Sequence, residues 1–443
     1  MIDISRETIF ALASAPGPAG IAVFRVSGPR ARHVAEIFDF RMPCARVASL
    51  RRLSVAGRQV DEGVVVWFDA PNSFTGEATV ELSVHGGRAV YDSVFRALDH
   101  EEGFRPAVPG EFSRRAVLNG RLDLTAAEAI NDLVNAETEA QQDLALQQMA
   151  GKLADQFNDF RKDVLAGRAQ LEAYIDFTDQ DLPGSVIEDV VPHLARLGRE
   201  MRSFLDDGRR GERLRSGLRV AVVGRPNAGK SSFVNWLAER DVAIVSEHPG
   251  TTRDVLEVQL DLGGYPVIVA DTAGLRAVSN PVEKEGIARA KSWAQNADLR
   301  IVMLDASDQK DIDDGSIQGL DPDLILVNKI DLEPLEVCRH GVLGISVTKE
   351  MGLAAAVAAM TGLAKGRLSW GGGPIMTRER HRSALTAAAA AVERAGGLLQ
   401  NQDPIELAGE ELRFASEALG RVTGHVDVEA VLDIVFRDFC IGK

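Results

Sequence analysis

The stretch Arg219–Ser232 reads RVAVVGRPNAGKSS, and it predicts a phosphate-binding loop that joins a strand to a helix. A short apolar run ends at Gly224, and Gly229, Lys230 and Ser231 follow after four residues. Glycines let such a loop turn its backbone N–H groups onto a phosphate, and the helix N-terminus adds a favourable dipole. We expect Lys230 to reach the β- and γ-phosphates of a nucleotide and the Ser231 hydroxyl to bind Mg²⁺. A glycine-rich turn with a chance lysine is the alternative, which the position between a strand and a helix disfavours.

Three more motifs follow in the order that guanine-nucleotide switches show. They are GTTRD at 250–254, DTAG at 271–274 and NKID at 328–331. Thr252 would complete the Mg²⁺ shell, Asp271 would hold the metal through water, and the Gly274 N–H would reach the γ-phosphate. A carboxylate at Asp331 can accept from both N1–H and N2–H of guanine, which predicts GTP rather than ATP. Each tetrapeptide is weak alone, but four motifs in this order, three of them at strand ends, indicate a GTPase.

The residue after the DTAG motif departs from Ras-type enzymes. Those enzymes carry a glutamine there that orients the attacking water, whereas this chain has Leu275. Hydrolysis must therefore be slow, or its transition state must be stabilised by other means. Asn227 inside the phosphate-binding loop offers one such means, because its side-chain oxygen could hold a monovalent cation beside the phosphates. A solvent-facing loop asparagine also fits the spacing.

Composition limits the class of protein. The chain has 443 residues, which at about 150 residues per domain suggests three domains. Its formal charge of −15 and pI near 5.1 exclude a global basic field, so any RNA contact must be local, transient or shared with a partner. Cys44, Cys338 and Cys440 lack metal-ligand spacing, which fits a reducing cytoplasm without disulfides. The N-terminus lacks the basic run of a signal peptide, and no run is long enough to cross a membrane.

The patterning predicts a multidomain α/β protein. Residues 1–118 alternate strand and helix patterns and form an N-terminal α/β domain, whereas residues 119–216 and 375–443 show helical periodicity. Residues 217–374 form the P-loop, Ras-like GTPase domain and end in the linker signal GGGP. Neither helical segment can bury its apolar face alone, so we expect one discontinuous helical domain with the GTPase domain inserted into it.

The N-terminal region carries polar residues on or beside its strands. We expect strands at Ile21–Val26, Gly63–Phe68 and Ala78–Val84, a helix at Ala89–Leu98, and further helices at Thr377–Gln400, Leu407–Leu419 and Asp427–Phe439. The unusual polar residues are Arg25, Glu81, His85, Glu111, Arg114 and Arg115. A charge in a strand usually lies on the wet face, so a functional interpretation requires several of them to converge. The run PNSFTGEATVELSVHGG has too many turn formers and polar groups to be core alone.

The C-terminal sequence is Phe439-Cys440-Ile441-Gly442-Lys443. It matches a prenylation signal poorly, because its last residue is lysine and the one before is glycine. Cys440 is either a small buried apolar side chain or a thiol on a tail that reaches a distant site. The residues themselves leave both options open.

Together these residues resemble the tRNA-modifying GTPase family known as MnmE or TrmE. The motifs that carry the resemblance are FRVSG, PNSFTGE, ELSVHGG, PGEFSRRAVLNGRLDLTAAEAI, GRPNAGKSS, GTTRD, DTAGLR, NKID and FCIGK. The resemblance implies a homodimer, formed through the N-terminal domain, that joins an FAD-dependent subunit of the MnmG or GidA type in a heterotetramer. It implies that the pair adds an aminomethyl or carboxymethylaminomethyl group to C5 of the wobble uridine, position 34, of certain tRNAs.

The resemblance also implies a folate site in the N-terminal domain. The one-carbon unit would come from 5-formyl- or methylene-tetrahydrofolate, as in the folate-dependent aminomethyltransferases that this domain is similar to. The residues implied to bind folate are Arg25, Glu81, Arg121 and Lys443. The family often has lysine where Arg121 stands, which keeps the charge but changes its geometry. Cys440 belongs to the family's terminal cysteine motif and is implied to act near the folate.

The resemblance assigns the nucleotide and ion ligands in more detail. The implied GTP site comprises Asn227, Ala228, Gly229, Lys230, Ser231, Ser232, Ser246, Thr251, Thr252, Asp271, Thr272, Ala273, Gly274, Asn328, Lys329, Asp331 and Ser346. The implied Mg²⁺ ligands are Ser231 and Thr252, and the implied K⁺ ligands are Asn227, Ser246, His248 and Thr251. This K⁺ would let two GTPase domains dimerise across the nucleotide and would place positive charge where an arginine finger otherwise acts. Glu283 is implied to orient the water, with Glu285 as a neighbouring candidate. Ser346-Val347-Thr348 departs from the family's usual Ser-Ala.

Two alternatives come from other classes of protein. The first is a regulatory GTPase switch in ribosome assembly or partner docking, and the second is a folate enzyme with a vestigial GTPase domain. The nucleotide motifs do not separate the first alternative from tRNA modification, but a docking module does not need Arg25, Glu81 and the FCIGK terminus. All four nucleotide motifs are intact, which argues against the second alternative.

Overall fold

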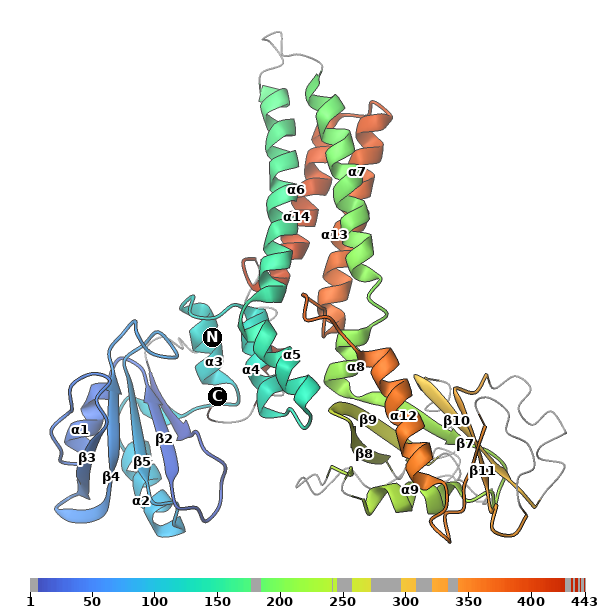
Figure 1. The fold of residues 1–443 in the computed structure, drawn as a ribbon. Coiled ribbons are helices and arrows are strands. Elements are labelled where there is room, and N and C mark those ends of the chain that lie inside the picture. Colours follow the sequence, from blue (N-terminus) through green and yellow to red (C-terminus); the bar gives the residue numbers. More distant parts are fainter. Residues whose placement is uncertain are drawn as a thin grey trace, which may run out of the picture. The chain divides into compact units, whose positions relative to one another are not determined.

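The computed structural model describes residues 7–176, 185–240, 242–244, 257–271, 296–307, 321–333 and 342–426, with Leu432, Val435, Phe436, Phe439 and Gly442 (Figure 1). The chain divides into two compact units. The first contains Met1–Asn131, Ala154–Leu194 and Ala391–Lys443, and the second contains Asp132–Leu153 and Ala195–Ala390. Each unit holds one six-stranded sheet, and each is assembled from segments that are distant in the sequence.

The sheet of the first unit has the strand order β3-β4-β5-β2-β1-β6. Its strands are β1 (Thr8–Leu12), β2 (Ala22–Ser27), β3 (Ser49–Val55), β4 (Arg58–Phe68), β5 (Thr79–Val84) and β6 (Phe104–Pro106). All neighbours are antiparallel except β1 and β6, which run parallel. The short helices η1 (Ala31–His33) and α1 (Val34–Ile37) precede β3, and α2 (Arg88–Asp99) follows β5. The three predicted strands and the predicted helix at Ala89–Leu98 are confirmed, although β4 begins five residues earlier than predicted.

One face of this sheet carries the core of the N-terminal domain. Phe24 on β2 and Leu82 on β5 are fully buried, and they pack with Val94 and Leu98 of α2. Because successive side chains of a strand point to opposite faces, Arg25 lies on the other face of the sheet. The alternation of burial along β2 therefore fixes where this arginine lies.

Long helices from both sides of the nucleotide-binding region pack together in the first unit. The helices of this part of the chain are α3 (Glu111–Leu118), α4 (Leu124–Val134), α6 (Lys152–Asp176), α7 (Ser185–Leu205), α13 (Glu379–Gln400) and α14 (Ile405–Thr423). In Figure 1, α6, α7, α13 and α14 lie side by side. A Cβ placed on Gly167 of α6 would lie 3.3 Å from Leu194 of α7 and 3.8 Å from Leu412 of α14. Arg394 of α13 pairs with Glu411 of α14 at 2.7 Å. The predicted discontinuous helical domain is thus confirmed.

The sheet of the second unit has the strand order β12-β11-β10-β7-β9-β8. Its strands are β7 (Leu218–Val223), β8 (Glu257–Leu262), β9 (Tyr265–Asp271), β10 (Leu299–Asp305), β11 (Leu324–Asn328) and β12 (Val342–Gly344), and its helices include α5 (Glu139–Met149), α8 (Arg210–Ser216), α9 (Lys230–Ala238) and α12 (Leu353–Leu368). All neighbouring strands are parallel except β8 and β9. The predicted α/β GTPase architecture is confirmed, whereas the three domain boundaries stay a prediction. Among the helices that the structure describes, none is both long and apolar enough to span a bilayer.

Two arginines join the chain segments that precede and follow the GTPase domain. Arg378 donates to both carboxylate oxygens of Asp132 at 2.6 and 2.9 Å. Arg382 donates to Asp207 at 2.5 Å and to Glu212 at 2.7 Å. These side chains are only 12 to 17% exposed, so water screens the charges weakly. The ion pairs bring the segment that enters the domain next to the segment that leaves it.

We predict that Arg382→Met destabilises the chain by about 2 to 4 kcal/mol, because it removes the counter-charge of Asp207 and leaves Glu212 with Arg209 alone in a largely buried place. Urea unfolding at neutral pH measures this change. Arg394→Met is the matched control, since the pair of Arg394 with Glu411 is half exposed. It should lower stability by less than about 1 kcal/mol. Equal effects of the two substitutions would contradict the structural role given to Arg382.

Candidate functional site

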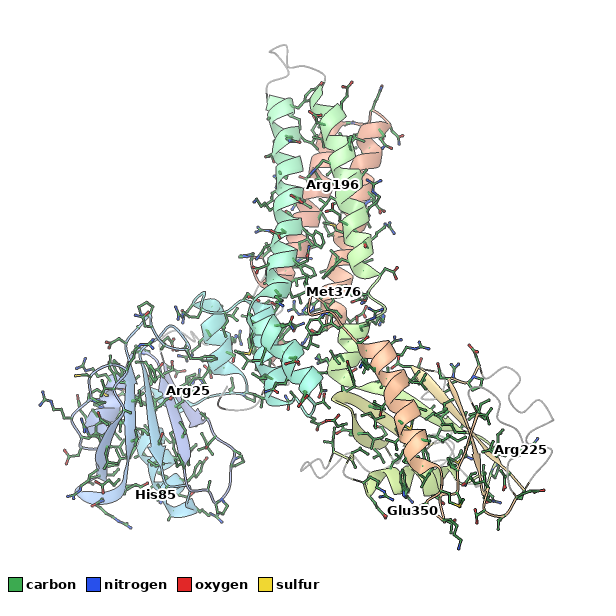
Figure 2. All side chains as sticks on the ribbon, viewed as in Figure 1. Arg25, His85, Arg196, Arg225, Glu350 and Met376 are labelled. Atoms are coloured by element: carbon green, nitrogen blue, oxygen red, sulfur yellow. The ribbon has the colours of Figure 1, made fainter. Side chains whose placement is uncertain are left out.

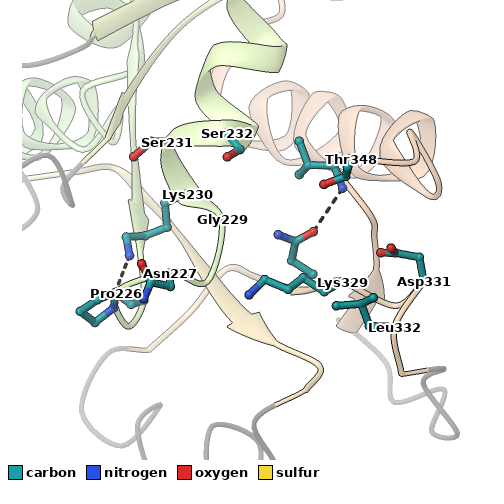
Figure 3. Close-up of a pocket in the computed structure, with 13 residues that line it drawn as sticks. Pro226, Asn227, Gly229, Lys230, Ser231, Ser232, Lys329, Asp331, Leu332 and Thr348 are labelled. Carbon is teal, nitrogen blue, oxygen red and sulfur yellow. Dashed lines mark hydrogen bonds between the residues drawn. The ribbon is translucent and has the colours of Figure 1, made fainter.

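A cavity of about 750 Å³ opens where β7 and β11 end (Figure 3). It is lined by Gly224, Pro226, Asn227, Gly229, Lys230, Ser231, Ser232, Asn328, Lys329, Asp331, Leu332, Val347 and Thr348. The two strands run parallel to β10, which lies between them, so the loops at their carboxyl ends meet at the same edge of the sheet. The structure therefore brings the phosphate-binding loop, the NKID motif and the loop at 346–348 together at one cavity.

The phosphate-binding loop has a backbone that requires its glycines. Gly224 and Gly229 have φ angles of 151° and 101°, and Asn227 lies in the left-handed region at 67°. A Cβ on Gly224 would collide with the carbonyl oxygen of Met303, and one on Gly229 would collide with the amide of Asn328. Asparagine is among the few other residues that tolerate the left-handed region. Helix α9 begins directly after the loop, so its N-terminus faces the cavity.

Lys230 is held inside the loop that it belongs to. Its side chain is only 4% exposed, and Nζ donates to the carbonyl oxygens of Gly224 at 2.8 Å and Arg225 at 2.6 Å. A buried ammonium at the mouth of a helix N-terminus is a strong attractor for phosphate oxygens. Ser231 and Ser232 are exposed to the cavity. A hydroxyl there fits Mg²⁺, which prefers oxygen ligands.

Asn328 lines the cavity, but its side chain is mostly used to connect two loops of the site. It is 4% exposed; its Nδ2 donates to Ala228 O at 2.9 Å, and its Oδ1 accepts from Val347 N at 3.2 Å. The sequence predicted Asn328 only as a nucleotide ligand, and it gave no signal for these two bonds. The structure adds a role in fixing the phosphate-binding loop against the loop at 346–348.

The other NKID residues are positioned by the end of β11. Lys329 lies in the left-handed region at φ 68°, and its Nζ pairs with Asp305 of β10 at 2.5 Å. Burial by itself raises the pKa of Asp305, but hydrogen bonds from Lys329 and Ser307 outweigh this and lower that pKa overall. Asp331 is exposed and lines the cavity, so its carboxylate is accessible to a base. Ser346 is buried, and its Oγ accepts from Lys349 N at 3.2 Å.

Many predicted ligands lie outside the described residues. These are Ser246, His248, Thr251, Thr252, Thr272, Ala273, Gly274, Glu283, Cys440 and Lys443. Asp271 is described as the last residue of β9, but its side chain is not. The assignments of these residues to GTP, Mg²⁺, K⁺, water and folate stay predictions.

A second constellation surrounds Arg25, on the face of the N-terminal sheet opposite the core that packs on α2 (Figure 2). Arg25 of β2 and Glu81 of β5 are direct cross-strand partners, and Arg25 Nε donates to Glu81 Oε1 at 2.9 Å. The guanidinium carbon lies 5.3 Å from the ring centre of Phe74 and 5.8 Å from that of Phe112. The two charged side chains remain 20 and 26% exposed, so a ligand can reach them.

Arg121 lies beside the same loop that brings Phe74 to Arg25. A Cβ placed on Gly76 would lie 3.1 Å from Cγ of Arg121, and Asn119 Nδ2 donates to Thr75 O at 2.7 Å. The loop at 72–77 thus connects two of the predicted folate residues, Arg25 and Arg121. Phe74 and Phe112 were not predicted from the sequence, because nothing local distinguishes these phenylalanines from core residues.

Buried charges anchor this loop. Glu77 accepts from Ser27 Oγ at 2.8 Å and from Arg115 Nη1 at 3.1 Å, and Arg115 also pairs with Glu111. Arg115 and Glu111 are each only 2% exposed. Of the six polar residues noted in the sequence, these two pair here and Arg25 pairs with Glu81, whereas the exposed His85 pairs with Asp61. Burial raises the pKa of Glu111, but hydrogen bonds from Arg105 and Val108 N with the nearby positive charges lower it overall. The cluster therefore holds the loop in place as paired ions.

The end of the chain packs against the N-terminal domain within the first unit. A Cβ on Gly110 would lie 2.9 Å from Cβ of Phe439, and a Cβ on Gly442 would collide with Leu12 O at the end of β1. Gly442 has a φ of 98°, which favours glycine. The strand β1 neighbours β2, with Ala11 opposite Arg25. Phe439 and Gly442 thereby contact the domain that carries Arg25.

Comparison with known proteins gives the following similarities. A family model described as the MnmE helical domain matches residues 124–440, and one described as the GTP-binding protein TrmE N-terminus matches residues 8–121. A protein of Paramagnetospirillum magneticum is 48% identical over 447 residues and one of Parvibaculum lavamentivorans is 49% identical over 440 residues. Both are named tRNA modification GTPase MnmE, and each comparison covers 99% of this chain and 100% of the relative.

Solved structures match the chain over shorter stretches. The G domain of the T. maritima FeoB iron transporter is 23% identical and covers 33% of this chain and 98% of its own, at a TM-score of 0.25. Aquifex aeolicus Era bound to GDP.AlF4- is 24% identical and covers 39% of this chain and 66% of its own, at a TM-score of 0.26. At these TM-scores neither likeness adds weight to the fold, which rests on the two sheets themselves.

We predict that Asn328→Ala lowers the free energy of unfolding by about 1 to 3 kcal/mol, because it removes two buried hydrogen bonds between the loops of the cavity. Asp331→Ala is the matched comparison. It should leave stability within about 0.5 kcal/mol but weaken GTP binding by roughly tenfold to a hundredfold, the effect of losing hydrogen bonds to a charged group. Thermal unfolding and fluorescent-nucleotide titration measure the two effects. Equal unfolding temperatures for both variants, or unchanged GTP affinity in Asp331→Ala, would contradict these roles.

Proposed function

This chain belongs to the MnmE family of tRNA modification GTPases, and from that premise we propose how its two sites contribute to one reaction. The chain is a GTPase that acts in tRNA modification. We propose that K⁺ activates its GTP hydrolysis and that it works as a homodimer with an FAD-dependent partner subunit in a heterotetramer. We further propose that the assembly adds an aminomethyl or carboxymethylaminomethyl group to C5 of the wobble uridine in the cytoplasm.

The observation that carries the hydrolytic part of the proposal is the shared cavity. Lys230 and the N-terminus of α9 supply positive charge for the phosphates, and Asp331 lies on the opposite side of the cavity for guanine. Ser231 offers a hydroxyl for Mg²⁺, which would neutralise charge that develops on the phosphates. The distance between the two motifs is thus set by the sheet, through the ends of β7 and β11.

Asn227 supports the proposed activation by K⁺. It lines the cavity, is exposed, and has a left-handed backbone conformation that keeps it within the loop. Its carboxamide oxygen suits a hard monovalent cation, which would add positive charge beside the phosphates. That charge offsets the absence of glutamine at Leu275, because stabilising transition-state charge is the main task in phosphoryl transfer. Ser246, His248 and Thr251 complete the proposed ligand set, and Glu283 is proposed to orient the water.

The Arg25 constellation supports the proposed folate site. Tetrahydrofolate combines a flat, hydrogen-bonding ring with a carboxylate tail. Arg25 can bind a carboxylate or ring acceptor, whereas Glu81 can accept from ring N–H groups. Phe74 and Phe112 hold the guanidinium in place, and Arg121 adds charge beside the loop that carries Phe74. Lys443 and Cys440 belong to the terminal motif whose neighbours Phe439 and Gly442 contact this domain. A regulatory docking module would need none of these features.

We predict that wild-type GTP turnover is at least about tenfold faster in KCl than in NaCl at equal ionic strength. This factor is smaller than the rate increase that an added positive charge at the transition state gives in other phosphoryl-transfer enzymes. Asn227→Ala should turn over GTP equally slowly in both salts while keeping its nucleotide affinity. Steady-state phosphate release and nucleotide titration measure these quantities.

Asn235→Ala serves as the control for this experiment. Asn235 is exposed on α9 and does not line the cavity, so its removal should leave the K⁺ response unchanged. A full K⁺ response in Asn227→Ala would overturn the cation assignment. Equal slow rates of the wild type in both salts would overturn K⁺ activation itself.

A further inference from the structure

An unusually basic segment lies in the N-terminal domain of this acidic chain. Residues 29–58 contain seven arginines, no lysine and two acidic residues, whereas the whole chain has 50 basic and 65 acidic residues. Six of these arginines form what we call the arginine edge: Arg32, Arg41, Arg46, Arg51, Arg52 and Arg58. All are exposed except Arg51, which is half-buried.

The arginine edge follows the outer border of a sheet. Strand β3 is the edge strand of the N-terminal sheet and pairs with β4 (Figure 1). The residues just before β3 also lie beside β4, because Ala45 forms a β-bridge with Trp67. Arg51 Nε donates to Arg41 O at 3.0 Å, which brings these two residues together. At the other end, Arg58 pairs with Val55 across the hairpin turn. The arginines therefore lie along an extended run of roughly 30 Å, at about 3.3 Å per residue.

Carboxylates among the described residues do not neutralise five of the six arginines of the edge. In the part of the chain that the structure describes, Arg32, Arg41, Arg46, Arg51 and Arg58 make no ion pair with a carboxylate. Arg52 is the exception, with Glu62 at 3.9 Å, and both side chains are largely exposed. Arginines elsewhere, such as Arg25 and Arg382, pair closely with acids. The positive charge of the edge is therefore available to bind a negatively charged partner.

Aromatic rings hold two of the arginines against the surface. The guanidinium of Arg32 lies 5.9 Å from the ring centre of Trp67, and that of Arg46 lies 5.8 Å from that of Phe68. Arg46 also donates to Asn72 O at 2.5 Å. Such stacking leaves donors of the guanidinium fork free to point outwards, and that fork matches the geometry of phosphate oxygens.

We propose that the arginine edge is the surface on which this chain docks the phosphate backbone of tRNA, an inference that rests on its proposed function in tRNA modification. A net charge of −15 repels a polyanion, so a stable contact needs a local basic surface. Neighbouring strand residues such as Arg51 and Arg52 point to opposite faces, so the edge presents positive charge on both sides of the sheet border. Phosphates that pass along this border would be contacted from both faces and would contribute affinity without sequence readout. Charged residues also protect an edge strand from pairing with another chain, and the experiment below separates that role from RNA binding.

The test measures the binding of unfractionated tRNA to the full chain by fluorescence anisotropy across a salt series. The variant Arg41→Gln/Arg51→Gln/Arg58→Gln removes three charges that have neither acidic nor aromatic partners. We expect its affinity to fall at least about tenfold at low salt. The slope of log affinity against log salt should fall by about 2 to 3, since each lost phosphate contact contributes roughly 0.7 to 0.9. The single variant Arg58→Glu changes one exposed residue at the hairpin turn. It should weaken tRNA binding severalfold without changing any residue of β3 itself.

The matched control is Arg199→Gln/Lys365→Gln/Arg210→Gln, which removes three exposed charges elsewhere. It should keep both the affinity and the salt slope of the wild type.

Equal losses in the control and the test variant would mean that net charge alone matters, and this result would overturn the proposal. Aggregation or changed self-association of the test variant with unchanged tRNA affinity would also overturn it, in favour of edge protection or a protein partner. K⁺-stimulated GTP turnover is measured on the same samples and should be unchanged in the test variant. Because this turnover does not require tRNA, it tests the proposed function separately from the docking surface.

Discussion

The ion pairs of Arg378 and Arg382 are the interaction on which the arrangement of the chain depends. A domain can be inserted into another only if its two ends lie close together. Asp132, Asp207 and Glu212 precede the GTPase domain in sequence, and the two arginines that follow the domain bind them. These contacts close the insertion, so that helices from both sides of it can share one apolar core.

Both functional sites lie where distant segments meet, and each is fixed by buried polar contacts. Asn328 joins the phosphate-binding loop to the loop at 346–348, so the phosphate and base regions of the cavity are rigidly related. In the N-terminal domain, Glu77 and Arg115 fix the loop that brings Phe74 to Arg25. Binding energy is used efficiently in such preformed sites, because little of it goes into ordering side chains.

The sequence predicted the parts whose signals are local. The phosphate-binding loop and NKID lie at one cavity, as expected, because parallel strands bring their carboxyl ends to one edge of the sheet. The link through Asn328 could not be predicted, since its partner Ala228 is one hundred residues away. The start of β4 was missed because RQVDEG lacks apolar alternation, and pairing with β3 defines it as a strand. The burial of Arg115 likewise depends on a tertiary partner, Glu77, which lies 38 residues away, as well as on Glu111 one helical turn before it.

The central claim is that this GTPase delivers a folate carbon to the wobble uridine of tRNA. The most direct measurement is mass spectrometry of tRNA nucleosides after incubation of tRNA and the full chain with the FAD-dependent partner subunit, GTP, Mg²⁺, K⁺, ammonium or glycine as the amine donor, and methylene-tetrahydrofolate whose methylene carbon is ¹³C. We predict a modified uridine whose C5 substituent carries the label, and no labelled product when GTP is omitted. Unmodified uridine despite GTP consumption, or a modified uridine without the label, would contradict the account.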